Sequence, residues 1–170
     1  LDAPVEARST PPARVYGNNL TFWYTSSKTW TLESGTYDIR GNLGFGIRDG
    51  VYTLDASVNN PTMIIGGSIK GGSYGGYTGY PLVKAGSGIW TVGGDIDFAG
   101  GNTDWQFEAG NSTFILNGTS AQTITSAGNS FNNLTIKNTS AEGVILADNL
   151  SVNGNLNLAA DGSSNELQTM

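Results

Sequence analysis

The chain has 170 residues, of which 25 are glycine and 13% are charged, and its formal net charge is −6 with neither cysteine nor histidine. This length suits one folded domain, and the acidic balance excludes nucleic acid as a favoured partner because phosphates need cationic side chains. The missing thiols and imidazoles exclude disulfides, cysteine or histidine catalysis and the usual zinc sites. No run of about 20 apolar residues occurs, so no membrane span is expected.

Residues 1–19 differ in character from the rest of the chain. Three of the five prolines lie here (Pro4, Pro11 and Pro12), and the segment shows no apolar periodicity. We expect an extended arm that leaves the domain body and contacts another copy, followed by a single domain at 20–170.

From Leu20 onward, apolar and polar residues alternate at period two, which predicts strands. No window of eleven or more residues keeps a helical stripe free of glycine, so almost no helix is expected. An exception is the Gly/Tyr-rich segment 71–81, which holds Tyr74, Tyr77 and Tyr80. It is interpreted as an insertion between strands or, alternatively, as a stacking surface for a sugar or a neighbouring subunit.

Four nine-residue stretches repeat one pattern: two alternating apolar residues, a turn containing glycine and a polar residue, and then a second alternating segment. They are 37–45, 63–71, 90–98 and 150–158, and their shared glycines Gly41, Gly67, Gly94 and Gly154 are separated by 26, 27 and 60 residues. The last separation is about two periods, with the looser Leu116-Asn117-Gly118 between. A strand-only repeat of roughly 25 to 30 residues has the length of one coil of a β-solenoid.

In such a coil each inward side chain stacks on its equivalent one coil further on, so the same apolar type recurs. Two inward ladders are predicted: Ile39, Ile65, Val92 and Val152, and Leu43, Ile69, Ile96 and Leu156. The four tryptophans (Trp23, Trp30, Trp90 and Trp105) are expected in the core or at its caps. A β-sandwich with hairpin turns is the alternative fold.

Three stretches (112–124, 130–138 and 150–156) resemble the repeats of large secreted microbial surface and adhesin-like proteins. The resemblance covers residues 88–158 well and 29–87 only through the nine-residue pattern. It implies an all-β, right-handed parallel β-helix, here of about five to six coils. It also implies a non-enzymatic role, since such repeats mostly serve as spacers or scaffolds.

Secretion is expected from the first residue, which is Leu1 and not Met, and from the abundant Asn, Ser, Thr and Gly. Glycosylation is predicted on at least one of four Asn-x-Ser/Thr acceptors, namely Asn111, Asn117, Asn133 and Asn138. Asn117 and Asn138 follow strands and should face outward. The competing interpretation is an inward ladder of hydrogen-bonded amides with no room for a sugar.

A cluster of carboxylates is the candidate metal site. Asp95 and Asp97 project from one face about 7 Å apart, Asp104 follows, and calcium prefers several such oxygen ligands. The alternative is a solvated acidic surface. No other cofactor is expected.

The same spacing is within the range of a two-carboxylate glycosidase, and Asn102-Thr103-Asp104 matches a tripeptide of the β-helical pectin hydrolases. The Gly-His-Gly of that family is missing. We therefore expect no catalytic residues and no enzyme activity.

The ends of a solenoid expose unpaired backbone groups over an apolar cross-section, and no capping helix is recognisable after Leu158. We therefore expect either that the chain is a piece of something longer or that another subunit covers this end. The leading hypothesis is a structural subunit of an extracellular fibre or surface layer, a homopolymer assembling through its open ends and arm. A carbohydrate-binding or adhesive module using the tyrosine segment is the second hypothesis. A β-helical polysaccharide-degrading enzyme or tailspike segment is the third.

Overall fold

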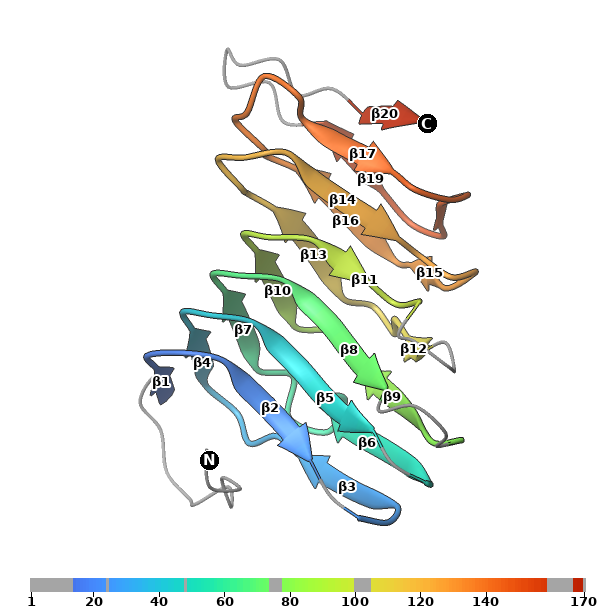
Figure 1. Cartoon of the computed structure of the whole chain (residues 1–170). Coiled ribbons are helices and arrows are strands. Elements are labelled where there is room, and N and C mark those ends of the chain that lie inside the picture. The colour runs from blue at the N-terminus through green and yellow to red at the C-terminus, as the bar shows by residue number, and fades with distance from the viewer. Residues whose placement is uncertain are drawn as a thin grey trace.

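The computed structural model describes residues 14–23, 25–47, 49–73, 78–99, 105–158 and 167–169, which form strands and turns and no helix (Figure 1). Sheet A contains β1 (Arg14–Tyr16), β4 (Thr36–Ile39), β7 (Thr62–Ile65), β10 (Ile89–Val92), β13 (Thr113–Leu116), β16 (Asn133–Ile136) and β19 (Leu156–Leu158). Sheet B contains β2 (Leu20–Trp23), β5 (Leu43–Ile47), β8 (Ile69–Ser73), β11 (Ile96–Asp97), β14 (Gln122–Thr125), β17 (Val144–Leu146) and β20 (Leu167–Thr169). Sheet C contains β3 (Lys28–Thr31), β6 (Val51–Asp55), β9 (Tyr80–Lys84) and β12 (Gln106–Glu108), and sheet D contains β15 (Ser130–Phe131) and β18 (Ser151–Val152).

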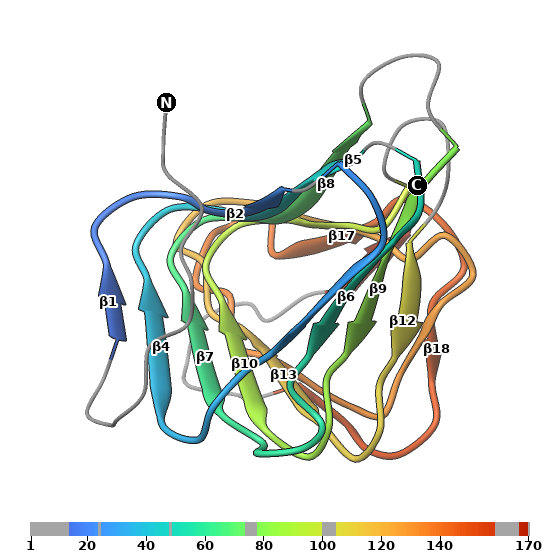
Figure 2. The same cartoon turned by 90° about the horizontal axis from the view of Figure 1, so that it is seen from below.

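These sheets form the sides of a parallel β-solenoid, which confirms the predicted fold. Every recorded strand pairing is parallel, and each strand pairs with the strand one coil before or after it. Seen along its axis, the chain turns from sheet A through sheet B to sheet C, clockwise as it recedes from its N-terminal coil (Figure 2). The solenoid is therefore right-handed.

The inward ladders are confirmed in their first three members and wrong in the fourth. One ladder runs Ile39, Ile65, Val92, Leu116, Ile136 and Leu158. The other runs Leu43, Ile69, Ile96, Ile124 and Leu146. Val152 pairs instead with Phe131 in sheet D, and Leu156 pairs with Leu134 in sheet A.

The cause of this error is that the coils differ in length. The equivalent residues Arg14, Tyr37, Met63, Trp90, Phe114, Leu134 and Leu156 are separated by 23, 26, 27, 24, 20 and 22 residues. Because the later coils are shorter, a period of 26 or 27 does not extrapolate to the C-terminal part. The turn at Gly154 consequently lies between β18 and β19, at a different corner from the turns at Gly41, Gly67 and Gly94.

Aromatic side chains fill much of the interior. Trp90 and Trp105 are each 1% exposed, as expected of core residues, and Trp105 meets Phe45 edge to face at 4.9 Å between ring centroids. Trp30 is half-buried and packs on Phe22 at 5.1 Å. Trp23 departs from the expectation, because it points outward from β2 and is 47% exposed.

The solenoid begins earlier than the predicted arm boundary at residue 19. β1 pairs with β4, and the Arg14 guanidinium donates to the Tyr37 hydroxyl and forms an ion pair with Glu33. Residues 14–19 therefore belong to the first coil, and the remainder of the predicted arm, residues 1–13, lies outside the described residues. Within the described part of the chain there is no helix long and apolar enough to cross a membrane.

Candidate functional site

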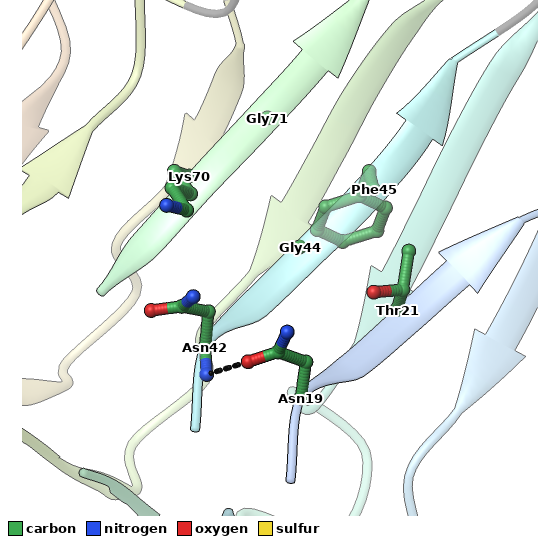
Figure 3. Close-up of a pocket in the computed structure, with 7 residues that line it drawn as sticks. All are labelled: Asn19, Thr21, Asn42, Gly44, Phe45, Lys70 and Gly71. Atoms are coloured by element: carbon green, nitrogen blue, oxygen red, sulfur yellow. Dashed lines mark hydrogen bonds between the residues drawn. The ribbon is translucent and has the colours of Figure 1, made fainter. Parts of the chain in front are cut away.

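A hollow of about 210 Å³ marks the outer face of sheet B, across β2, β5 and β8 (Figure 3). Its lining consists of Asn19, Thr21, Asn42, Gly44, Phe45, Lys70 and Gly71. Gly44 lies between Thr21 and Lys70 in the parallel register, and all three positions face outward. The missing side chain at the centre of this row creates the depression.

The rim of the hollow belongs to a polar ladder that joins successive coils. The backbone N–H of Asn42 donates to Asn19 Oδ1 at 2.8 Å, and that of Ser68 donates to Asn42 Oδ1 at 2.8 Å. Further along the axis, Asp95 N–H donates to Ser68 Oγ at 2.9 Å and Thr123 N–H donates to Asp95 Oδ1 at 2.8 Å. The polar residue after each corner glycine therefore accepts a hydrogen bond from the next coil, which gives the repeated pattern a physical cause.

The hollow was not among the sites predicted from the sequence. A signal for it exists in β5, which reads Leu43-Gly44-Phe45-Gly46-Ile47. The apolar residues of this strand alternate with two glycines on the outward side. Glycine weakens a strand and often marks a close approach of another group.

The candidate calcium ligands have structural partners where the chain is described. Asp95 Oδ1 is a member of the polar ladder, and Asp97 Oδ1 accepts from the Ala99 N–H at 3.0 Å. Asp97 is also in register with Lys70 on the neighbouring strand, an arrangement in which opposite charges attract. Asp104 lies outside the described residues, and within them no group of three or more acidic, His or Cys side chains could hold a metal. The calcium site stays a prediction, and the partners of Asp95 and Asp97 favour the solvated-surface alternative.

The tyrosine segment is only partly described. Strand β8 extends to Ser73 and β9 starts at Tyr80, so strand structure enters the predicted loop from both sides. Tyr80 is half-buried in β9 and in register with Val51. Tyr74 and Tyr77 lie outside the described residues, so the stacking surface stays a prediction.

Among the predicted glycosylation acceptors, Asn111 and Asn117 are exposed, and Asn117 faces outward as expected. Asn133 is half-buried, and its Oδ1 accepts from the Asn155 N–H at 3.0 Å in the manner of the ladder interpretation. Attachment of a glycan to Asn111 or Asn117 stays a prediction.

The expectation that Asn138 faces outward is wrong, because Asn138 is 0% exposed. It follows Ile136 at the same corner where Gly118 follows Leu116 one coil earlier. There its amide donates to Ser120 O at 2.7 Å and to the buried Gln122 Oε1 at 2.9 Å. Sugar on this nitrogen would displace both acceptors, so the folded chain has no room for a glycan at this position.

The two ends of the described solenoid differ. In the last sheet A strand, Leu156 and Leu158 are 47% and 48% exposed, although they occupy inward positions of the ladder. Their neighbours one coil earlier, Leu134 and Ile136, are fully buried. At the opposite end the inward Leu20 and Phe22 of the first coil are buried.

Comparison of the chain with protein-family models, curated proteins and solved structures found no match. The resemblance to surface and adhesin-like repeats therefore depends on the sequence pattern alone.

Proposed function

We propose that this chain is a non-enzymatic structural subunit of an extracellular fibre or surface layer, whose C-terminal coil docks on the N-terminal coil of another copy. The observation that carries this proposal is the exposure of Leu156 and Leu158 at inward positions. Apolar side chains that stack on a neighbour in every earlier coil meet water here, and covering them is favourable by about 25 cal/mol per Å² buried.

A second copy fits this end because the solenoid repeats itself along its axis. Among the described strands, β19 pairs only with β16 and β1 pairs only with β4, so each has a free edge. Joining β19 to β1 of the next copy would continue sheet A in the same parallel register. Tyr16 would then stack on Leu158, and the aliphatic part of Arg14 would cover Leu156. Stable association needs roughly 1,000 Å² or more of buried surface, so the remaining sheets of the coil must take part.

The assembly is tested with the double variant L156D/L158D, which places charges on the proposed contact. Wild-type protein should form concentration-dependent oligomers in sedimentation velocity and filaments in negative-stain images. The double variant should remain monomeric with an unchanged circular dichroism spectrum. The matched control is Ile89→Asp, because Ile89 is 46% exposed on the outer face of sheet A and away from the end.

Two results would contradict the proposal: a wild-type chain that is monomeric at high concentration, or a double variant that assembles as the wild type does. Deletion of residues 1–13 separately tests the predicted role of the arm. The truncated protein should keep the folded solenoid but assemble more weakly.

The carbohydrate-binding hypothesis is retained as the second function because of the hollow on sheet B. The lining of this hollow includes Gly71, the first residue of the tyrosine segment 71–81.

A further inference from the structure

An exposed tryptophan stands beside the hollow on sheet B. Trp23 lies two residues after Thr21 on β2, and both side chains point outward, so they are about 7 Å apart along one face. The indole covers Gly46 of the adjacent strand, where a Cβ atom would lie only 2.2 Å from Trp23 Cδ1. Glycine at this position lets the ring lie against the sheet while 47% of the residue stays exposed to solvent.

The floor and size of the hollow limit what it can hold. Its centre is the bare backbone at Gly44, and its volume is about 210 Å³. Pockets for drug-sized ligands measure roughly 300–1,000 Å³. The hollow therefore admits a single small ring, and a longer ligand would have to continue across the face of the sheet.

Polar donors surround this space with their orientation already set. The Oδ1 atoms of Asn19 and Asn42 accept ladder hydrogen bonds, which turns each Nδ2 amide away from the ladder. Within the described residues, neither amide nitrogen makes a hydrogen bond, and none is found for the Thr21 hydroxyl or the Lys70 ammonium. Fixed donors of this kind lose little entropy when a ligand binds.

We propose that this face binds two neighbouring pyranose rings of a polysaccharide. The apolar C–H face of one ring stacks on Trp23, and the hydroxyls of the next ring, seated in the hollow, accept hydrogen bonds from the amides of Asn19 and Asn42. An apolar ligand would leave these donors buried without partners. A phosphate ligand is disfavoured because Lys70 is the only cation among the seven lining residues and the chain carries a net charge of −6.

This inference concerns ligand binding by a single copy of the chain and is independent of assembly. It gives the carbohydrate-binding hypothesis a site on sheet B that shares Gly71 with the tyrosine segment. To keep the two questions apart, binding is measured on both the wild type and the monomeric L156D/L158D variant. Loss of assembly with retained binding, or the reverse, identifies which of the two proposals fails.

The experiment is isothermal titration calorimetry with two soluble probes, cellohexaose and hexagalacturonate. The wild type should bind at least one of them, and Trp23→Ala should lose about tenfold or more in affinity because the stacking partner is gone. Asn42→Asp is the sharper variant, since a carboxylate still accepts the Ser68 N–H but has no amide donor. It should weaken binding about fivefold or more while the melting temperature is unchanged.

Ile89→Ala is the matched control, because it removes an equally exposed apolar side chain from sheet A and should not affect affinity. If hexagalacturonate binds better and Lys70→Met removes the preference, Lys70 pairs with the sugar carboxylate at the same site. The proposal is overturned if neither probe binds at millimolar concentration. It is also overturned if both Trp23→Ala and Asn42→Asp bind as tightly as the wild type.

Discussion

Replacing the buried Asn138 by alanine tests the polar network that joins the later coils. Asn138 Oδ1 accepts from the Ser140 N–H at 2.8 Å and from the Ser140 hydroxyl at 2.6 Å. Its amide donates to Ser120 O and to Gln122 Oε1. Gln122 in turn reaches the previous coil through a 3.0 Å hydrogen bond from Nε2 to Val92 O. One side chain thus connects two corners of adjacent coils.

The cost of N138A follows from which of these groups can find new partners. Gln122 Oε1 keeps its hydrogen bond from the Gly118 N–H, and Ser120 is exposed and can bond to water. The Ser140 N–H is left without an acceptor in a residue that is only 8% exposed, which costs about 1–3 kcal/mol. Including the small cavity left by the amide, we expect a loss of about 2–4 kcal/mol in the free energy of unfolding. In a domain of this size that corresponds to a melting temperature lower by about 5–15 °C.

The assay is urea denaturation followed by circular dichroism, together with a thermal melt. Asn117→Ala is the matched control because Asn117 is also an asparagine at a corner of the solenoid but is exposed, and its loss should cost under about 0.5 kcal/mol. The reasoning is refuted if N138A is within about 1 kcal/mol of the wild type. It is equally refuted if N117A costs as much as N138A.

The remaining predictions concern glycine packing and alkaline pH. Gly88→Ala should destabilise the fold by about 1–3 kcal/mol, because its Cβ would lie 2.2 Å from Pro61 O; Gly17→Ala, with no atom within 4 Å, should be near neutral in the same denaturation assay. Burial raises the pKa of the Tyr37 hydroxyl, although the hydrogen bond from the Glu33 N–H and the Arg14 charge act in the opposite direction. The contribution of the neutral Tyr37 hydroxyl to folding stability is therefore complete below pH 10.0, the pKa of this group in the unfolded chain. It is lost as pH rises through the higher pKa of the folded state. Melting temperatures measured from pH 8 to about pH 11 should fall less steeply for Tyr37→Phe than for the wild type, and an equal slope would contradict this assignment.

The sequence predicts the position of the coils best where its repeated pattern is required by contacts between neighbouring coils. Gly41, Gly67 and Gly94 sit at one corner because the preceding coil passes close to them, and a Cβ at Gly94 would lie 2.7 Å from the Gly67 carbonyl carbon. The residue after each glycine must then supply the acceptor of the ladder. Both requirements appear in the sequence as Gly plus a polar residue. The pattern at Gly154 has similar local constraints at another corner, so sequence similarity alone could not distinguish the two corners.

Buried polar residues and outward aromatic residues are harder to predict, because their placement depends on neighbours far away in sequence. Asn138 looks like an exposed acceptor in its local context, and only the position of Gln122 one coil earlier shows why it turns inward. Trp23 looks like a core residue until Gly46 is placed beside it. Each of these facts depends on parallel register over about 20 residues, which varying coil length makes uncertain from the sequence alone.

The two outward glycines of β5 weaken the strand that forms the centre of the hollow. A strand glycine costs roughly 0.5–1 kcal/mol relative to alanine, so Gly44 and Gly46 together weaken β5. Gly46 has a structural reason, since Trp23 covers it, but a Cβ at Gly44 would approach Lys70 O only to 3.1 Å and Thr21 Oγ1 only to 3.9 Å. Alanine at Gly44 would need the Lys70 carbonyl to move by a few tenths of an ångström, whereas alanine at Gly46 would collide with the Trp23 indole. A side chain added at Gly44 would also fill the hollow, so glycine at this position keeps open the space that the proposed sugar would occupy.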